Sequence, residues 1–207
     1  MKKRINYLLT VLFISTISFG QSSVKYSLKG GLNSSNTKFS VIKMGHYSSR
    51  EFDNRNSFYI GGAIEFFINS KFKNLSLQVE LIYSEQGNTY DFTAFISTDE
   101  INQINMPIVL KKPIITDFYG VLGGYIGHVI HAKEKYSDSS NKFEIEGYKN
   151  VDAGFIFGLE YQFNFGLFLE TRYLFGIADI SKVSYPSSFI EHEYKNRLFQ
   201  LGLGYRF

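Results

Sequence analysis

Few side chains in this sequence are spaced for catalysis or metal binding. The chain contains four histidines and no cysteine, so it can form no disulfide. His128 and His131 precede Ser137, Ser139 and Ser140, which makes serine chemistry a candidate. Such chemistry needs a nucleophile, a base and an orienting acid joined by hydrogen bonds, and this spacing supplies no such set. Residues three positions apart in a strand face opposite sides, so the two histidines are also a poor chelating pair. We predict no enzyme and no catalytic, cofactor-binding or metal site.

Charged residues alternate with apolar residues along several segments of the chain. Successive side chains of a β-strand point to opposite faces, so this alternation places the charges on one face and the apolar residues on the other. We predict that the charged face carries a structural network of eight residues, namely Lys29, Glu65, Glu80, Lys111, Glu160, Glu170, Arg172 and Arg206.

The period-two pattern divides the chain into eight predicted strands. They cover residues 26–33, 58–69, 75–84, 102–111, 118–131, 151–163 and 167–177, with a last strand that starts near residue 196. Segment 118–131 is apolar on both faces, so its orientation stays open. Connections 69–74, 112–117 and 164–166 are short, whereas 34–57, 85–101, 132–150 and 178–195 are long and polar. Strict alternation predicts a meander with short turns at one end and long loops at the other.

The last strand shows most clearly what surrounds these strands. Every second residue from Phe199 to Phe207 is apolar or aromatic, and Gln200, Gly202, Gly204 and Arg206 lie between them. A soluble ligand-binding barrel would be apolar inside and charged outside. Only a membrane barrel lets the uncharged face cover the whole circumference, with the charges in the lumen. We therefore predict an all-β fold, an eight-stranded antiparallel up-and-down transmembrane β-barrel in the cell outer membrane.

The N-terminal residues have the layout of a secretory signal peptide. Lys2, Lys3 and Arg4 precede a short apolar run that is too short to span a bilayer, and small residues follow. We expect a signal peptide at 1–20 and one barrel domain at 21–207. These three bases account for the whole formal charge of +3, so the remaining charge is balanced and gives no indication of nucleic-acid binding.

Several short motifs resemble those of a known family. They are S-F-G-Q at 18–21, K-G-G-L-N at 29–33, E-L-I-Y-S-E-Q-G at 80–87, I-N-M-P-I at 104–108 and L-G-Y-R-F at 203–207. The chain resembles the small outer-membrane β-barrel proteins of Bacteroidetes, with their porin-like, PorT-like barrel domain. The resemblance implies an eight-stranded barrel in outer-membrane lipid and recognition of the last strand by the barrel-assembly machinery. Some members of that family serve protein secretion.

The predicted barrel leaves little room for a channel. The interior of an eight-stranded barrel is just filled by side chains, so we expect the charge network to plug the lumen. A three-residue turn at 164–166 would place Glu160 opposite Glu170, and Glu65 and Glu80 would repeat that arrangement with Lys111. The function is then expected at the long extracellular loops, in surface interaction with a protein partner or in envelope or secretion support. A lipid-modifying enzyme and a narrow solute pore stay open as alternatives.

Overall fold

The computed structural model describes residues 24–43, 46–68, 75–92, 95–136, 142–144, 148–181 and 190–207. The predicted signal peptide and Ser137, Ser139 and Ser140 lie outside the described residues. The strands are β1 (Val24–Lys43), β2 (His46–Glu51), β3 (Asp53–Ile68), β4 (Leu75–Phe92), β5 (Phe95–Ile115), β6 (Phe118–Tyr136), β7 (Lys142–Glu144), β8 (Val151–Gln162), β9 (Leu167–Gly176) and β10 (Ile190–Arg206). In the described part of the chain, no helix is both long and apolar enough to cross a membrane.

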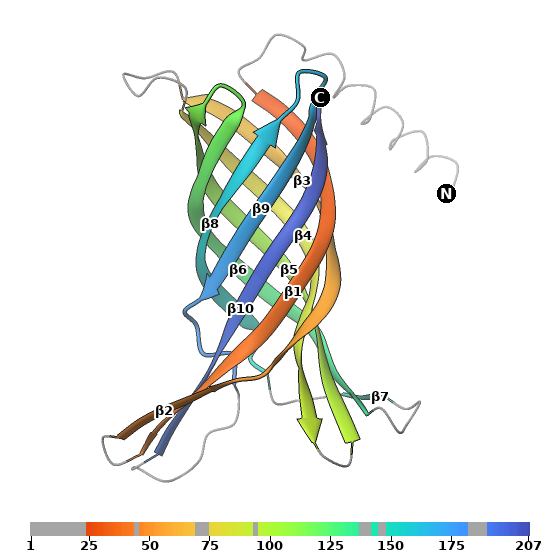
Figure 1. Cartoon of the computed structure of the whole chain (residues 1–207), viewed down its shortest axis with the longest axis vertical. Coiled ribbons are helices and arrows are strands. Elements are labelled where there is room, and N and C mark those ends of the chain that lie inside the picture. The colour runs from red at the N-terminus through yellow and green to blue at the C-terminus, as the bar shows by residue number, and fades with distance from the viewer. Residues whose placement is uncertain are drawn as a thin grey trace, which may run out of the picture.

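Eight of these strands form the wall of a barrel (Figure 1). Their order is β10-β9-β8-β6-β5-β4-β3-β1, every described pairing is antiparallel, and β10 also pairs with β1, so the sheet closes on itself. The remaining two described strands, β2 and β7, pair only with β1 and β6 respectively and extend beyond the wall. The predicted eight-stranded antiparallel barrel is confirmed.

The strands are longer than the sequence pattern predicts at the long-loop end. β4 and β5 stay paired up to Phe92 and Phe95, where a loop over 85–101 was expected. β1 and β10 likewise stay paired out to Lys43 and Ile190. Beyond the apolar band of the wall, the outward residues are polar like the inward ones. The alternation of apolar and polar residues therefore ends there, although the backbones of the strands stay paired. Figure 1 shows these extensions at the end of the barrel opposite the C-terminus.

The outer wall is apolar around the barrel. Leu28, Leu81, Leu122 and Leu201, from four different strands, are each 51–64% exposed. The open orientation of 118–131 is now defined, because Leu122 faces outward and Tyr125 is buried in the lumen. A patch this large and continuous is far beyond what a soluble monomer exposes, so this face requires lipid.

Aromatic rings gather at both ends of the apolar wall, as expected of interfacial girdles. At the short-turn end the rings of Tyr161 and Phe163 are 4.8 Å apart, and those of Tyr205 and Phe207 are 5.2 Å apart. At the other end Phe58 lies 6.2 Å from Tyr83. These rings mark the two borders of the apolar band.

Candidate functional site in the barrel lumen

Four charged side chains meet in the middle of the lumen. The ammonium group of Lys29 lies 2.6 Å from Glu80 Oε2 and 3.1 Å from Glu170 Oε1. Arg172 Nη1 donates to both oxygens of Glu80, at 2.8 and 3.0 Å. Its Nη2 lies 2.9 Å from Glu170 Oε2 but is not aligned for a hydrogen bond, so that contact is Coulombic. All four side chains are at most 1% exposed. We call these residues the central tier.

The central tier connects opposite walls of the barrel. Arg172 and Glu170 belong to β9, and Glu80 belongs to β4, which lies four strands from β9 in either direction. Lys29 on β1 stands between them, two strands from each. Tyr59 of β3 adds a hydrogen bond from its hydroxyl to Glu170 Oε1 at 2.7 Å. The side chains of this tier therefore extend across the full width of the lumen.

A second charged group, the rim tier, lies nearer the short-turn end. Lys111 Nζ contacts Glu160 Oε1 at 2.6 Å and Glu65 Oε2 at 3.3 Å. Arg206 Nη2 contacts the same two carboxylates, at 2.7 and 3.2 Å. Gln78 links the tiers, because its Oε1 accepts from Lys111 and its Nε2 donates to Glu80. Each tier holds two cations and two carboxylates, so buried charge is balanced locally.

The pairing differs from the sequence prediction in one respect. Glu160 is opposite Glu170 and Phe163 hydrogen-bonds to Leu167, so the predicted three-residue turn is confirmed. The proposed repeat of this arrangement is wrong, because Glu80 is opposite Ala63 and Glu65 is opposite Gln78. Lys111 contacts Glu65 and Glu160 but makes no contact with Glu80 among the described ion pairs. In a narrow barrel the long side chains reach across the lumen, so neighbouring-strand register does not decide their partners.

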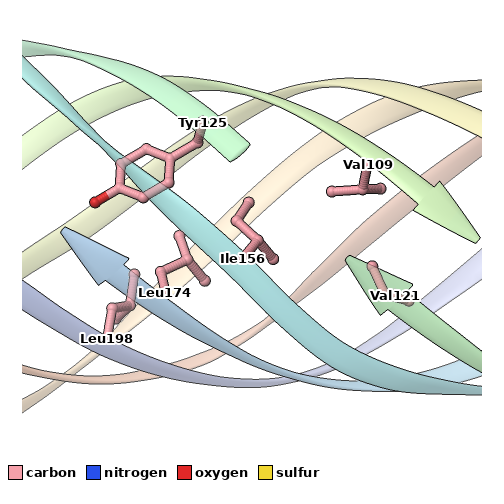
Figure 2. Close-up of a cluster of buried hydrophobic side chains, with 6 residues drawn as sticks. All are labelled: Val109, Val121, Tyr125, Ile156, Leu174 and Leu198. Atoms are coloured by element: carbon pink, nitrogen blue, oxygen red, sulfur yellow. The ribbon is translucent and has the colours of Figure 1, made fainter. Parts of the chain in front are cut away.

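An apolar cluster lies beside the charged tiers, where Val121 is opposite Lys111 and Val109 is opposite Gln78, and it extends from there toward the long-loop end. Figure 2 shows it inside the barrel, with side chains from β5, β6, β8, β9 and β10, namely Val109, Val121, Tyr125, Ile156, Leu174 and Leu198. None is more than 4% exposed. Sequence reasoning missed this cluster because it took the inward face of the other strands as small or polar and left the orientation of segment 118–131 open. The signal was present, since Leu174 and Leu198 interrupt that face at inward positions.

Polar side chains fill the lumen beside and beyond the apolar cluster. Asn196 donates to Gln86 Oε1 and, at 3.2 Å, to Asp152 Oδ2. Tyr125 donates to the same oxygen of Asp152 at 3.1 Å. Gln200 donates to Asn33 at 2.9 Å. Buried amides and carboxylates of this kind are stable because they are hydrogen-bonded to one another.

Two connecting segments fold over the mouth of the lumen at the long-loop end. Tyr148 forms a β-bridge with Ser181, and the Lys149 amide donates to Ile180 O at 2.7 Å. The Tyr148 hydroxyl donates to Asp99 Oδ2 at 2.6 Å, and the Tyr90 hydroxyl donates to the same oxygen at 3.1 Å. Tyr148 also packs against an apolar cluster of Ile101, Val129 and Ala132. We call this arrangement the mouth cap.

The mouth cap is expected to depend on pH through Asp99. Burial raises the pKa of the Asp99 carboxyl, although the two tyrosine hydroxyls oppose the shift. The closed cap therefore binds the proton more tightly than an open one. The contribution of the Asp99 proton to the stability of the cap is complete below the ordinary aspartate pKa of about 3.9 and is lost as pH rises through the raised pKa. Hydrogen exchange of the Lys149 amide, corrected for intrinsic rates, should show more protection near about pH 4 than near about pH 7. Asp99→Asn should flatten this dependence, and protection that increases with pH would contradict it.

The histidines do not occupy the positions that the sequence predicts. Gln103 pairs with Val129 and Asn102 with His131, so a bulge leaves Ile130 without a register partner. Because of this extra residue, His128 and His131 are both exposed on the outer face rather than on opposite faces. His131 contacts the Asn102 amide at 3.0 Å. Among the described residues, no three histidine or acidic side chains are grouped to hold a metal ion.

A closed antiparallel barrel with an apolar outer wall, aromatic girdles and buried charges in the lumen defines a small outer-membrane β-barrel protein. The chain belongs to the outer membrane protein beta-barrel domain family, whose model matches residues 19–182. Its location is the outer membrane. No curated protein matches the chain.

The chain is similar to several solved structures of outer-membrane proteins. Neisserial surface protein A is 9% identical, with 90% of this chain and 98% of that chain covered and a TM-score of 0.52. Ail, the attachment invasion locus protein of Yersinia pestis, is 16% identical, with 88% and 98% covered and a TM-score of 0.46. Outer membrane protein OprG from Pseudomonas aeruginosa is 11% identical, with 91% and 98% covered and a TM-score of 0.47. At such identities the likeness concerns the fold alone.

Proposed function

We propose that this protein is a non-catalytic outer-membrane barrel with a plugged lumen, and that it acts through its extracellular hairpins and loops. Its role is surface interaction with a protein partner, or envelope or secretion support. The observation that carries the proposal is the succession of buried side chains along the lumen. The rim tier fills the short-turn end of the lumen, the central tier and the apolar cluster lie side by side above it, and the polar residues and the mouth cap fill the lumen toward the long-loop end.

The charged tiers support a structural role rather than a conducting one. Each of the four cations contacts two carboxylates, so none is left to attract a passing ion. Wide aqueous channels are built from about 16 strands or more, twice the number here. A narrow solute pore would have to disrupt both tiers, since ion pairs in the central tier reach from β4 to β9.

The extensions at the long-loop end support a role in interaction. β1 and β10 stay paired as far as Lys43 and Ile190, and β2 adds a further strand beside β1. Such paired strands present a preorganised surface, which lowers the entropic cost of binding a partner. The motif resemblance to PorT-like barrels favours secretion support as one form of this role. By the same resemblance, the barrel-assembly machinery inserts the chain.

A complementation experiment tests where the function lies. In a strain that lacks the gene, one variant replaces β2 and β7 with short turns, and a second carries the paired lumen substitutions Arg172→Met and Glu170→Gln. We expect both variants to fold and reach the outer membrane, because β2 and β7 lie outside the wall and the second variant keeps the lumen neutral. The measurement is the resistance of the cells to detergent. The first variant should fail to restore this resistance, whereas the second should restore it.

The opposite result would support the pore alternative. If the lumen variant fails and the variant without β2 and β7 succeeds, the function lies inside the barrel. The lipid-modifying alternative predicts a third pattern, in which His131→Ala changes outer-membrane lipid composition. We expect that substitution to have no effect, since His131 contacts Asn102 and no described serine.

A further inference from the structure

A groove on the outer wall combines basic and apolar side chains. Its volume is about 220 Å³, and it is lined by Lys38, Ser40, Phe175, Ile177, Glu193, Lys195 and Arg197, from β1, β10 and the end of β9. Three of the seven lining residues are basic and one is acidic. The groove is separate from the lumen, because all of these positions lie on the outward face.

The strand register brings two lysines together on that face. Lys38 is directly opposite Lys195 in the β1–β10 pair. Like charges in this position destabilise a sheet unless an anion lies between them. Lys195 has one carboxylate partner, Glu193, at 2.6 Å. Lys38 has no carboxylate partner among the described side chains. Lys38 is also opposite Glu51 in the β1–β2 register. With Glu193 and Glu51 counted against Lys38, Lys195 and Arg197, one net positive charge remains for an external anion to neutralise.

Arg197 is the next outward residue of β10 after Lys195, toward the short-turn end, and several contacts hold its guanidinium in place. Its guanidinium stacks on Phe175, 3.7 Å from the ring centre, and its Nη1 donates to Gly176 O at 2.7 Å and Asn196 O at 2.8 Å. Within the described residues its Nη2 makes no hydrogen bond. A guanidinium fixed in this way is preorganised to bind a phosphate.

The height of the groove identifies what it meets in the membrane. On β10, Phe199, Leu201 and Leu203 are about half exposed and face the lipid, and Arg197 is the next outward residue toward the long-loop end. The groove thus lies where the apolar band ends and the headgroups of the outer leaflet begin. Phe175 and Ile177 would contact the upper part of an acyl chain, while the two lysines face its headgroup. Arg197 is only 9% exposed and lies at the inner edge of the groove.

We infer that this groove binds a phosphorylated lipid of the outer leaflet, with the phosphate between Lys38, Lys195 and Arg197. Basic pockets at the membrane border recognise anionic headgroups in this way. The site would tie a lipid to the seam between β1 and β10, where the barrel closes. This inference rests on the outer-membrane location and is independent of the proposed plug.

Binding to the folded full-length barrel in zwitterionic detergent tests the inference. Native mass spectrometry would measure the affinity for bisphosphorylated lipid A and for the same lipid without phosphates. The Lys38→Gln, Lys195→Gln double variant should bind the phosphorylated lipid about thirtyfold more weakly, which corresponds to about 1 kcal/mol for each lysine near an anionic surface. Lys112→Gln is the matched control, because Lys112 is an outward lysine near the short-turn end, and it should bind like the unmodified protein.

Four further outcomes decide the matter. The dephosphorylated lipid should bind the unmodified protein and the double variant equally weakly. Equal binding of both lipids by the unmodified protein, or unchanged binding by the double variant, would overturn the inference. Complete displacement of the lipid by millimolar inorganic phosphate would also overturn it, because the groove would then be a site for free phosphate.

Discussion

Replacing Arg172 with methionine is expected to lower the free energy of unfolding by about 3–5 kcal/mol, the usual cost of removing one partner of a buried ion pair. The guanidinium is 1% exposed and contacts Glu80 and Glu170 together. Without it, two buried carboxylates share Lys29 alone, so one negative charge is left uncompensated. Urea unfolding in lipid vesicles would measure the loss.

Two companion variants make this result specific to charge. Glu170→Gln in the same chain removes the excess negative charge and should restore part of the lost stability. Lys149→Met is the control, because Lys149 contacts Asp179 at 2.6 Å but is 48% exposed. An exposed pair contributes about 0–1 kcal/mol, so this variant should unfold nearly like the unmodified protein. Unchanged stability of Arg172→Met would show that the central tier does not hold the lumen together.

Gly31→Ala should be the most damaging small substitution at the seam of the barrel. Gly31 is opposite Gly202 in the β1–β10 pair, and an added Cβ would overlap the Leu201 carbonyl oxygen and the Gly202 Cα. The obstacle is main chain, which cannot move without separating the strands. Overpacking typically costs about 1–3 kcal/mol, and we expect the upper part of that range. Loss of heat-modifiable gel mobility would report incomplete closure.

Gly62→Ala is the matched control for the seam variant. A Cβ there would meet the Ser27 carbonyl oxygen at 3.5 Å, an ordinary contact. Glycine within a strand is unfavourable by about 0.5–1 kcal/mol relative to alanine, so this variant should be neutral or slightly more stable. If both alanine variants behave alike, close approach at the seam does not determine closure.

The fold was predictable because lipid imposes a simple rule on outward residues. Leu28, Leu81 and Leu201 must be apolar wherever the wall faces acyl chains, so the period-two pattern is strong in the membrane and the strand number follows from it. The same rule explains the errors in strand length. Beyond the apolar band, outward residues such as Glu85 and Glu100 face water, and the pattern no longer distinguishes strand from loop although β4 and β5 stay paired.

The lumen was less predictable, because its contacts depend on tilt and on the reach of side chains. The sequence indicates that Glu160 and Glu170 face inward, and a short turn decides that they are opposite each other. It does not indicate that Arg172 reaches Glu80 on the far wall, nor that Lys111 reaches Glu160. The bulge at Ile130 is equally invisible to a period-two count, and it reversed the expected orientation of His131.

Planar-bilayer recording of the unmodified barrel tests the central claim most directly. The proposed plug predicts no steady conductance after insertion, in a membrane where a porin with about 16 strands gives large, stable steps as the positive control. Brief, rare openings of the mouth cap would leave that prediction intact, because the tiers and the apolar cluster lie beneath it. A steady, ohmic conductance from the unmodified protein would contradict the plug and favour a solute pore.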